Sequence, residues 1–559
     1  MLVLRISTVL ACVVAIYGYA GYRDQIPNGH ILPHPCVAGE LWQGVGHVNP
    51  AGGGERNQFG IDFANQGRNW ANVCNLDSDG DGMTNGQELG DPQCIWTSGA
   101  TPTRTTGLTH PGYCTPSSTQ TCAGLATPSC ESSTFDCPPI SDAGVLSRDL
   151  RFPRTQVPNT ETNYYCMTFD LDQSRDYHMI ATKPDIDNVN VMHHILLYGC
   201  RDDAPVIPNP RSCGMATQDC NELIGLWTVG MDGQCLNTAA GFRIGTTGIK
   251  RVLLEYHWNN PELRPDFTDS TGFTIYYTPN LRSNDAGVLW TGQMHLDIPP
   301  GQSRAVFESI CPSECTNKFS DKIYITQGLN HMHYKGIAQM VELFSNGERR
   351  YLTNDTHYSY DSPKVYEYNP PVALNPGDSL KTTCVYQTLK ETKTTTYGEA
   401  TSDEMCFAFF TFYPKQSVRN PFCVGWKKIQ QCASQDGTLF GCNDDVFHNI
   451  SHPETAMVVD KVLANCNSYG GCRYECPAAI AEAEKHPCLA NPDIKDWALN
   501  RMSHSDIKAL KFVAAMESCT CKNGNGWTTH RYPYSSAGTE TAVSLVTTVL
   551  SAVFYVVVA

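Results

Sequence analysis

The sequence predicts a mainly β protein in which two consecutive β-sandwich (jelly-roll-like) domains follow a small calcium-loop domain and precede a Cys-rich, partly helical region. The middle of the chain carries β-branched and aromatic runs bounded by Pro, Asp and Asn, at residues 164–169, 177–181 and 275–278. Few long amphipathic helical patterns interrupt these runs, which favours sandwiches. The 559 residues exceed the usual size of one domain, and a hydrophobic content of 41% is enough for several cores.

The chain begins with the features of a secreted protein. Residues 1–20 combine a basic start at Arg5, an apolar run over 9–16 and a small-x-small cleavage site at 18–20, which predicts a signal peptide. The 26 cysteines predict a disulfide framework and an oxidising compartment. Cleavage would remove Cys12 and leave an odd number, which predicts a free thiol or an intermolecular bridge. The net charge of −16 and the lack of a basic block argue against nucleic acid as a partner.

Residues 21–96 form the first predicted domain, and their most specific motif is an acidic loop over 77–88. The loop fits Asp-x-Asp-x-Asp-Gly-x5-Glu, the spacing of calcium-binding loops. The predicted ligands are the carboxylates of three aspartates, one backbone carbonyl, one asparagine and a closing glutamate: Asp77, Asp79, Asp81, Met83, Asn85 and Glu88. An acidic turn without an ion is the alternative. No helical pattern precedes the loop, so we expect a structural Ca²⁺, with Cys74 and Cys94 bridged around it, and not a sensor.

Three further segments complete the organisation outside the β-domains. Residues 97–146 are rich in Ser, Thr, Pro and Gly, and we expect a disulfide-pinned linker. Residues 426–534 are helical in pattern and Cys-rich, and residues 535–559 end in an uncharged apolar run after small residues. That end predicts a GPI-attachment signal, with a membrane-spanning anchor as the alternative. Glycan acceptors at Asn354 and Asn449 agree with an extracellular or cell-surface location.

Residues 147–299 and 300–425 are the two predicted β-domains, and the first contains three histidines of interest. His193 and His194 open an apolar run that favours a strand, and His257 follows on a second strand pattern. Adjacent residues of a regular strand point to opposite faces. Both imidazoles can therefore bind one metal only if the strand is bulged or ends there, or if one ring uses its other nitrogen.

The second β-domain adds His331, His333 and the thioether of Met405. The i, i+2 spacing of the two histidines predicts that they share one face of a strand. Imidazole suits several transition metals, and a thioether favours copper, which must be held in a soft monovalent and a harder divalent state. Methionine is more often core filler. The combined pattern predicts a two-copper redox enzyme. A zinc hydrolase is disfavoured, because no glutamate lies in zinc-protease spacing and a thioether is an unusual zinc ligand.

The first domain resembles temptin-like secreted proteins, on the evidence of segments 22–29, 44–47, 56–60 and 86–92. The resemblance covers about 75 residues. It implies an adhesive or docking role toward an extracellular protein partner.

The two β-domains resemble the type II, ascorbate-dependent copper monooxygenases, the family of dopamine β-monooxygenase and peptidylglycine hydroxylase. Segments 193–200, 254–257, 269–278 and 404–406 carry the resemblance. It implies a first, electron-transferring copper on His193, His194 and His257, a second, dioxygen-binding copper on His331, His333 and Met405, and ascorbate as reductant. The family usually has Thr at the position of Met332, whose side chain we expect to face away from the metal. The resemblance also implies the disulfides Cys166–Cys213, Cys200–Cys220, Cys311–Cys423 and Cys384–Cys406, and in the dopamine-type branch a bridge from Cys315 to a C-terminal cysteine.

The implied reaction is the hydroxylation of a substrate C–H bond with O₂. Peptide-amidating relatives hold a terminal carboxylate with Arg, Asn and Tyr at the positions of Leu329, Phe407 and Phe409. We therefore expect a small aromatic, amine-like or hydrophobic substrate, although the sequence identifies no amine anchor. His357 belongs to a motif of the dopamine-type branch and is expected either to line the site or to lie on the surface. The alternatives are a temptin-like extracellular binding or signalling protein with an inactive oxygenase scaffold, and a peptidylglycine-type hydroxylase.

Overall fold

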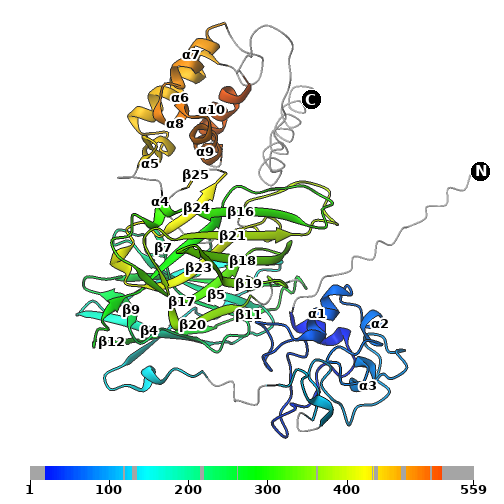
Figure 1. Cartoon of the computed structure of the whole chain (residues 1–559). Coiled ribbons are helices and arrows are strands. Elements are labelled where there is room, and N and C mark those ends of the chain that lie inside the picture. The colour runs from blue at the N-terminus through cyan, green and yellow to red at the C-terminus, as the bar shows by residue number, and fades with distance from the viewer. Residues whose placement is uncertain are drawn as a thin grey trace, which may run out of the picture.

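The computed structural model places two β-domains at the centre of the molecule, with a loop-rich N-terminal unit and a helical C-terminal unit at their two ends (Figure 1). It describes residues 19–116, 120–128, 135–213, 219–260, 262–360, 363–398, 400–427, 429–430, 432, 438–466, 474–503 and 507–518. The predicted C-terminal anchor and most of the predicted signal peptide lie outside these ranges. None of the described helices combines the length and the apolar character needed to cross a membrane.

Short helices and long loops build the N-terminal unit. Its elements are η1 (Tyr19–Gln25), α1 (Gln58–Asn65), α2 (Trp70–Val73) and α3 (Asn85–Glu88). Polar side chains begin these helices, because Asn57, Asn69 and Thr84 each accept a hydrogen bond from a backbone N–H of the first turn. Trp42 and Phe59 are buried in the core.

The core of this unit continues past residue 96 into the stretch predicted to be a linker. Leu108 and Tyr113 pack in the same cluster as Trp42. Beyond them, the chain forms η2 (Gln120–Cys122) and η3 (Pro138–Ser141), pinned by the disulfides Cys114–Cys122 and Cys137–Cys235. The linker is thus pinned by disulfides, as expected, but its first part contributes apolar side chains to a core.

The first β-domain packs a six-stranded sheet against a five-stranded sheet. The strand orders are β1-β12-β4-β9-β13, with β8 paired to β4, and β6-β3-β10-β5-β7. Alternating apolar side chains of β5 and β10, such as Ile195 and Val252, fill the space between the two sheets. The strands are β1 (Leu146–Arg151), β3 (Thr162–Asp170), β4 (Asp176–Asp185), β5 (Met192–Cys200), β6 (Arg211–Ser212), β7 (Cys220–Thr228), β8 (Gln234–Cys235), β9 (Ala240–Gly245), β10 (Arg251–Asn259), β12 (Gly272–Thr278) and β13 (Asn284–Asp285), with a separate pair β2 (Thr155–Gln156) and β11 (Thr268–Asp269).

The second β-domain repeats this plan with sheets of six and four strands. The orders are β20-β17-β23-β14-β24-β25 and β16-β21-β18-β19. Ile325, Val341 and Phe410 are buried between them. The elements are β14 (Gly287–Gln293), β16 (Ala305–Cys311), α4 (Ser313–Thr316), β17 (Ile323–His331), β18 (Gly336–Ser345), β19 (Glu348–Asp355), β20 (Val365–Leu374), β21 (Ser379–Tyr386), β23 (Cys406–Tyr413), η4 (Lys415–Ser417), β24 (Phe422–Trp426) and β25 (Ile429–Gln430), with the pair β15 (Asp297–Ile298) and β22 (Thr395–Thr396). The prediction of a mainly β chain with two consecutive sandwiches is confirmed.

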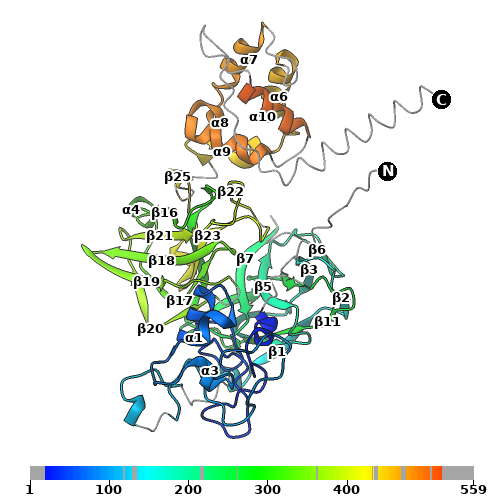
Figure 2. The same ribbon diagram turned by 90° about the vertical axis from the view of Figure 1, so that its right-hand side faces the viewer.

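The C-terminal unit is helical and cross-linked. It contains β26 (Thr438–Leu439), β27 (Cys442–Asn443), α5 (Asp444–His448), α6 (Pro453–Asn465), α7 (Cys476–Ala483), α8 (Pro487–Ala490), α9 (Pro492–Ser503) and α10 (Ile507–Ser518). The disulfides Cys442–Cys488 and Cys466–Cys476 cross its core. Trp426 of β24 belongs to the same core, so the helices are packed directly onto the end of the second domain. Figure 2 shows them on the side of the β-domains opposite the N-terminal unit.

One loop of the N-terminal unit, residues 49–56, contacts both β-domains. Asn49 donates a 2.8 Å hydrogen bond to the carbonyl of Gly230 in the first domain. Arg56 donates a 2.6 Å bond to the carbonyl of His357 in the second, and Glu55 pairs with Lys364 at 2.7 Å. The unit therefore bridges the two domains.

The disulfides agree with the pairing that the family resemblance implied. The structure joins Cys166–Cys213, Cys200–Cys220, Cys311–Cys423 and Cys384–Cys406, and also Cys74–Cys94 beside the acidic loop. Cys315 pairs with Cys432, which lies at the start of the C-terminal unit.

Candidate metal centres

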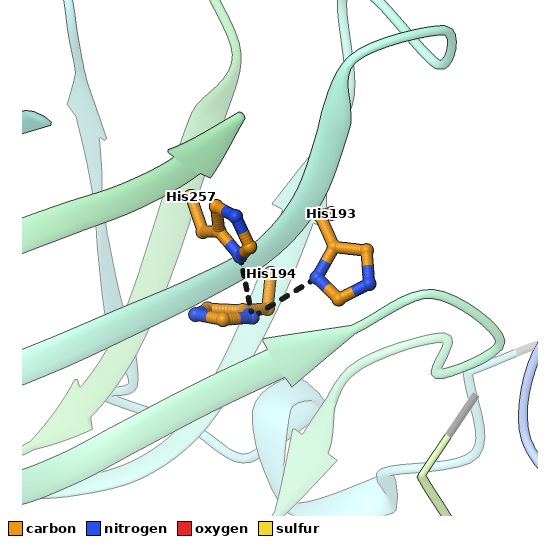
Figure 3. Close-up of side chains that lie close together, drawn as sticks. All are labelled: His193, His194 and His257. Carbon is orange, nitrogen blue, oxygen red and sulfur yellow. Dashed lines mark hydrogen bonds between the residues drawn. The ribbon is translucent and has the colours of Figure 1, made fainter. Parts of the chain in front are cut away.

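The first candidate centre comprises His193, His194 and His257, which lie on two neighbouring strands of the five-stranded sheet (Figure 3). His257 on β10 stands opposite His194 on β5, and the next residue, Trp258, stands opposite Met192. His193 is therefore the extra residue of a β-bulge. The bulge lets two adjacent side chains turn to the same side of the strand, the first of the conditions derived from the sequence.

The three imidazoles are almost completely buried and converge through Nδ1. The side chains are 4%, 8% and 1% exposed in sequence order. The Nδ1 atoms of His193 and His194 lie 3.2 Å apart, and those of His257 and His194 lie 3.3 Å apart. Two imidazoles bound tetrahedrally to one ion at ~2.0 Å hold their nitrogens ~3.3 Å apart. The spacing of this cluster thus fits a shared metal ion.

Burial keeps the rings of His194 and His257 neutral. It lowers the pKa of His194 and of His257 well below the ordinary histidine value, and repulsion from the neighbouring histidines lowers both further. A neutral imidazole offers a nitrogen lone pair to a metal. Tyr164 of β3 stacks on His257 at 4.5 Å between ring centroids and fixes the orientation of that ring.

The second candidate centre lies at the end of β17. His331 is the last residue of the strand and His333 follows it, with the ring centroids 5.4 Å apart. The prediction that both histidines lie on one strand is therefore wrong, because β17 ends at His331, although the two rings do lie close together. Burial lowers the pKa of His331 to about 3 and that of His333 to about 4.

Hydrogen bonds orient His333 and connect its backbone to that of Met405. The Nδ1 of His333 lies 3.2 Å from the carbonyl of Asp403, which fixes the proton on Nδ1 and leaves the lone pair on Nε2. The buried carboxylate of Glu404 accepts bonds from the backbone N–H groups of His333 at 2.8 Å, Met405 at 3.3 Å and Lys335 at 2.6 Å. Burial raises the pKa of Glu404 to about 7.

Buried nitrogens at this second centre fit a metal. The Nε2 atoms of His331 and His333 have no hydrogen-bond partner among the described residues, a situation that costs about 1–3 kcal/mol per group unless another ligand binds. Met405 is 3% exposed, and its side chain and that of His331 line the same cavity. Met332 is packed in a separate apolar cluster and does not line that cavity, as expected. Two imidazoles and a thioether suit copper.

One cavity of about 770 Å³ is lined by members of both centres, namely His193, His194, His331 and Met405, whereas His257 and His333 are not among its lining residues. Its walls are largely apolar and include the three positions singled out for the lack of a carboxylate anchor, Leu329, Phe407 and Phe409. Tyr360 of the second domain also lines it. The ring of Tyr360 stacks on His193 at 5.0 Å and lies 5.4 Å from His333, so one aromatic side chain contacts both centres.

Sequence reasoning missed Tyr360 and pointed to its neighbour His357. The His357 side chain is exposed and does not line the cavity, whereas Tyr358 and Tyr360 do. The alternation of aromatic residues at 358 and 360 was the available signal, since such spacing in extended chain sets side chains on one side.

The acidic loop of the N-terminal unit forms a third cluster. Carboxylate oxygens of Asp77, Asp79 and Asp81 lie within 4.8 Å of one another. Glu88 is fully buried, and neither of its carboxylate oxygens has a hydrogen-bond partner in the part of the chain that the structure describes. Burial, and then repulsion from the aspartates, raises its pKa to about 9, and burial raises that of Asp79 to about 6. The Asn85 amide N–H groups donate to the Val73 carbonyl and the Ser78 hydroxyl, which anchors the loop to the core.

Comparisons with known proteins agree with this geometry. Residues 148–265 match the N-terminal domain of the copper type II ascorbate-dependent monooxygenases, residues 284–435 match the C-terminal domain, and residues 16–113 match the temptin C-terminal family.

Several curated relatives share about 30% identity with about half of this chain. A tyramine beta-hydroxylase of Caenorhabditis briggsae is 32% identical over 303 residues, 50% of this chain and 52% of the relative. DBH-like monooxygenase protein 1 of Gallus gallus is 31% identical over 49% of this chain and 48% of its own. Dopamine beta-hydroxylase of Rattus norvegicus is 29% identical over 50% of this chain and 48% of its own. The chain spans about half the length of these relatives.

Proposed function

We propose that this chain, which carries both domains of the copper type II ascorbate-dependent monooxygenases behind a temptin-type domain, hydroxylates small aromatic or hydrophobic substrates. One oxygen atom of O₂ enters a substrate C–H bond, and the other leaves as water after reduction by two electrons from ascorbate and two protons. The observation that carries the proposal is that members of both centres, His193 and His194 of the first and His331 and Met405 of the second, line one largely apolar cavity.

The two centres divide the work by their ligands. Bound copper supplies one-electron redox chemistry and an open coordination position for O₂. His193, His194 and His257 form a buried, all-imidazole centre suited to storing an electron. His331, His333 and Met405 form a softer centre beside the apolar walls, where a substrate is held close to the reacting oxygen.

Residues around the ligands hold this arrangement. Glu404 ties the backbone of His333 to that of Met405, and Tyr164 stacks on His257. Tyr360 belongs to the second domain and rests on His193 of the first, so it keeps the two centres facing each other. Preorganised ligands of this kind lower the cost of each change in metal oxidation state.

The apolar lining selects the substrate class. Leu329, Phe407 and Phe409 offer no charge to hold a carboxylate, which disfavours a peptide ending in glycine. A cavity of about 770 Å³ accommodates an arylalkyl substrate with room for solvent.

We also propose that the protein acts outside the cell or at its surface. Many disulfides connect the described residues, and such bonds persist in oxidising compartments. The acceptors Asn354 and Asn449 are both exposed, which suits glycosylation. A GPI anchor at the C-terminus and an extracellular partner of the temptin-type domain belong to this proposal.

The acidic loop is proposed to bind a structural Ca²⁺. Three aspartates and a buried glutamate provide the oxygen ligands that this cation prefers, and the glutamate oxygens have no hydrogen-bond partner among the described residues. Because α2 and α3 are only four residues each, the loop lacks the long helices whose movement makes an EF-hand a sensor.

Metal analysis combined with oxygen uptake tests the monooxygenase proposal. The secreted full chain should hold two copper ions and consume O₂ in the presence of ascorbate and a phenethylamine, but not with a glycine-extended peptide. Met405→Leu should abolish uptake and lower the copper content. Met332→Leu is the matched control, since Met332 is a buried methionine that lies outside the cavity. Full oxygen uptake in Met405→Leu would contradict the assignment.

A further inference from the structure

The helical C-terminal unit forms part of the wall of the cavity. His448 of α5 and Trp497, Asn500 and Arg501 of α9 line it together with residues of both β-domains. These four residues lie beyond position 435, where the match to the C-terminal monooxygenase domain ends. They therefore belong to a part of the chain to which the matched domains assign no role.

The helical unit is firmly attached at this wall. Trp426 of β24 is buried in the helical core, against which Met294 of the second domain also packs. Lys427 pairs with Asp496 of α9 at 2.6 Å, and the indole N–H of Trp426 donates to the same carboxylate at 3.4 Å. Since α9 is held to the sheet beside the cavity, its side chains have defined positions in the wall.

The side chain of His448, which lines this wall, contains a hydrogen-bond acceptor. Its Nδ1 lies 3.1 Å from a carboxylate oxygen of Asp444, one helical turn earlier. A carboxylate only accepts hydrogen bonds, so in the neutral ring the proton is on Nδ1 and the lone pair is on Nε2. This Nε2 is buried and has no hydrogen-bond partner in the described part of the chain.

The neighbouring charges balance. Asp444 also pairs with the guanidinium of Arg501, which lies 5.5 Å from the centre of the Trp497 ring. One anion and one cation cancel, so the wall offers an oriented acceptor among aromatic surfaces without a net charge.

We propose that His448, held by Asp444, binds the hydrogen-bond-donating end of the substrate, an amine or a phenolic hydroxyl on an aromatic ring. The C-terminal unit then determines specificity, because the β-domains supply the apolar walls and the metal ligands while α5 supplies the polar contact. This inference rests on the proposed function, since it takes the cavity to be the substrate site. It also supplies the anchor that the sequence did not reveal.

Kinetics with paired substrates test the inference on the copper-loaded full chain. Phenethylamine carries a donor, ethylbenzene has the same ring and a similar reacting carbon without one, and 3-phenylpropionate carries a carboxylate. His448→Phe should raise KM for phenethylamine by about tenfold or more, because the variant loses one hydrogen bond to the amine of the substrate. It should leave turnover of ethylbenzene and the copper content unchanged. His448→Gln should recover part of the loss, because its amide oxygen accepts a hydrogen bond. His357→Phe, at an exposed histidine outside the cavity, is the control.

Three outcomes would overturn the inference. An equal loss for phenethylamine and ethylbenzene in His448→Phe would assign His448 to packing. An unchanged KM for phenethylamine in His448→Phe would show that His448 does not bind the donor. If the wild-type chain prefers 3-phenylpropionate and Arg501→Gln loses that preference, the wall is a carboxylate site. If the wild-type chain consumes no O₂ with any substrate, the proposed function fails separately. Calorimetric titration of phenethylamine into wild type and His448→Phe then still decides whether His448 binds the donor.

Discussion

The acidic loop gives the sharpest quantitative prediction, which concerns Glu88 and the removal of Ca²⁺. Burial and the nearby aspartates raise the pKa of Glu88 from 4.5 to about 9. In the metal-free protein the folded state therefore holds a proton that the unfolded state releases between these pH values. A raised carboxyl pKa makes folding less favourable as pH rises, so the metal-free loop should be more stable at pH 5 than at pH 7.

The size of this effect follows from the two pKa values. The interval from pH 5 to pH 7 lies between them, so Glu88 alone should lower the free energy of local unfolding by about 2.5 kcal/mol across it. Asp79, whose pKa is raised to about 6, acts in the same direction up to that pH. Bound Ca²⁺ favours the ionised carboxylates and should remove most of this dependence.

Amide hydrogen exchange of residues 70–96 in the full chain, read by mass spectrometry at both pH values, measures the local stability. With a chelator, protection corrected for intrinsic exchange should fall from pH 5 to pH 7, and added Ca²⁺ should restore it. Glu88→Gln is the isosteric control: without metal it should be more stable than wild type at pH 7, and it should respond weakly to Ca²⁺. The reasoning is refuted if wild type and Glu88→Gln show the same pH dependence and neither responds to Ca²⁺.

Three other changes have defined outcomes. Gly53→Ala places a Cβ 2.2 Å from the Val229 carbonyl oxygen, so it should separate the N-terminal unit from the β-domains. X-ray scattering should then give a larger radius of gyration, and the amide of Val229 should exchange its hydrogen faster. Gly54→Ala, also at positive φ but with open space around the added Cβ, should change neither measurement. Tyr360→Ala should reduce ascorbate-dependent O₂ uptake about tenfold at unchanged copper content. Tyr360→Phe should have an intermediate rate, because it keeps the stacking ring but loses the hydroxyl that lies 3.3 Å from the Nδ1 of His257. Glu404→Gln turns an amide N–H₂ toward a backbone N–H, so two donors face each other. It should lower the free energy of unfolding by about 1–3 kcal/mol, measured by thermal denaturation, and it should lower the copper content.

The sequence located the residues of the candidate centres because ligand type and short spacing are local properties. The acidic loop places every ligand within twelve positions, and adjacent histidines need only a bulge to share one metal. The family resemblance supplied the rest, including the pairing of Cys166, Cys200, Cys311 and Cys384 with their partners. The mainly β class followed from alternation and composition, which depend on each strand having one buried face.

Local patterns were less reliable where the backbone departs from regular geometry. The i, i+2 argument placed His331 and His333 on one strand, but β17 ends at His331, and the buried carboxylate of Glu404 holds the turn that follows. A turn stabilised by a residue about seventy positions away leaves no periodic signal. The first part of the predicted linker likewise belongs to a core, because Leu108 packs against elements that precede it in the chain.

By itself the sequence determined the β class, the secretory character, the identity of the candidate metal ligands and the apolar nature of the pocket, since each depends on residue type and near neighbours. Only the tertiary structure decided that Tyr360 rests on His193, that the N-terminal loop at Arg56 bridges the two domains, and that His448 of the helical unit reaches the cavity. These contacts join segments tens to hundreds of positions apart. They arise from the packing of whole domains against one another, which periodicity and composition along one stretch of chain do not encode.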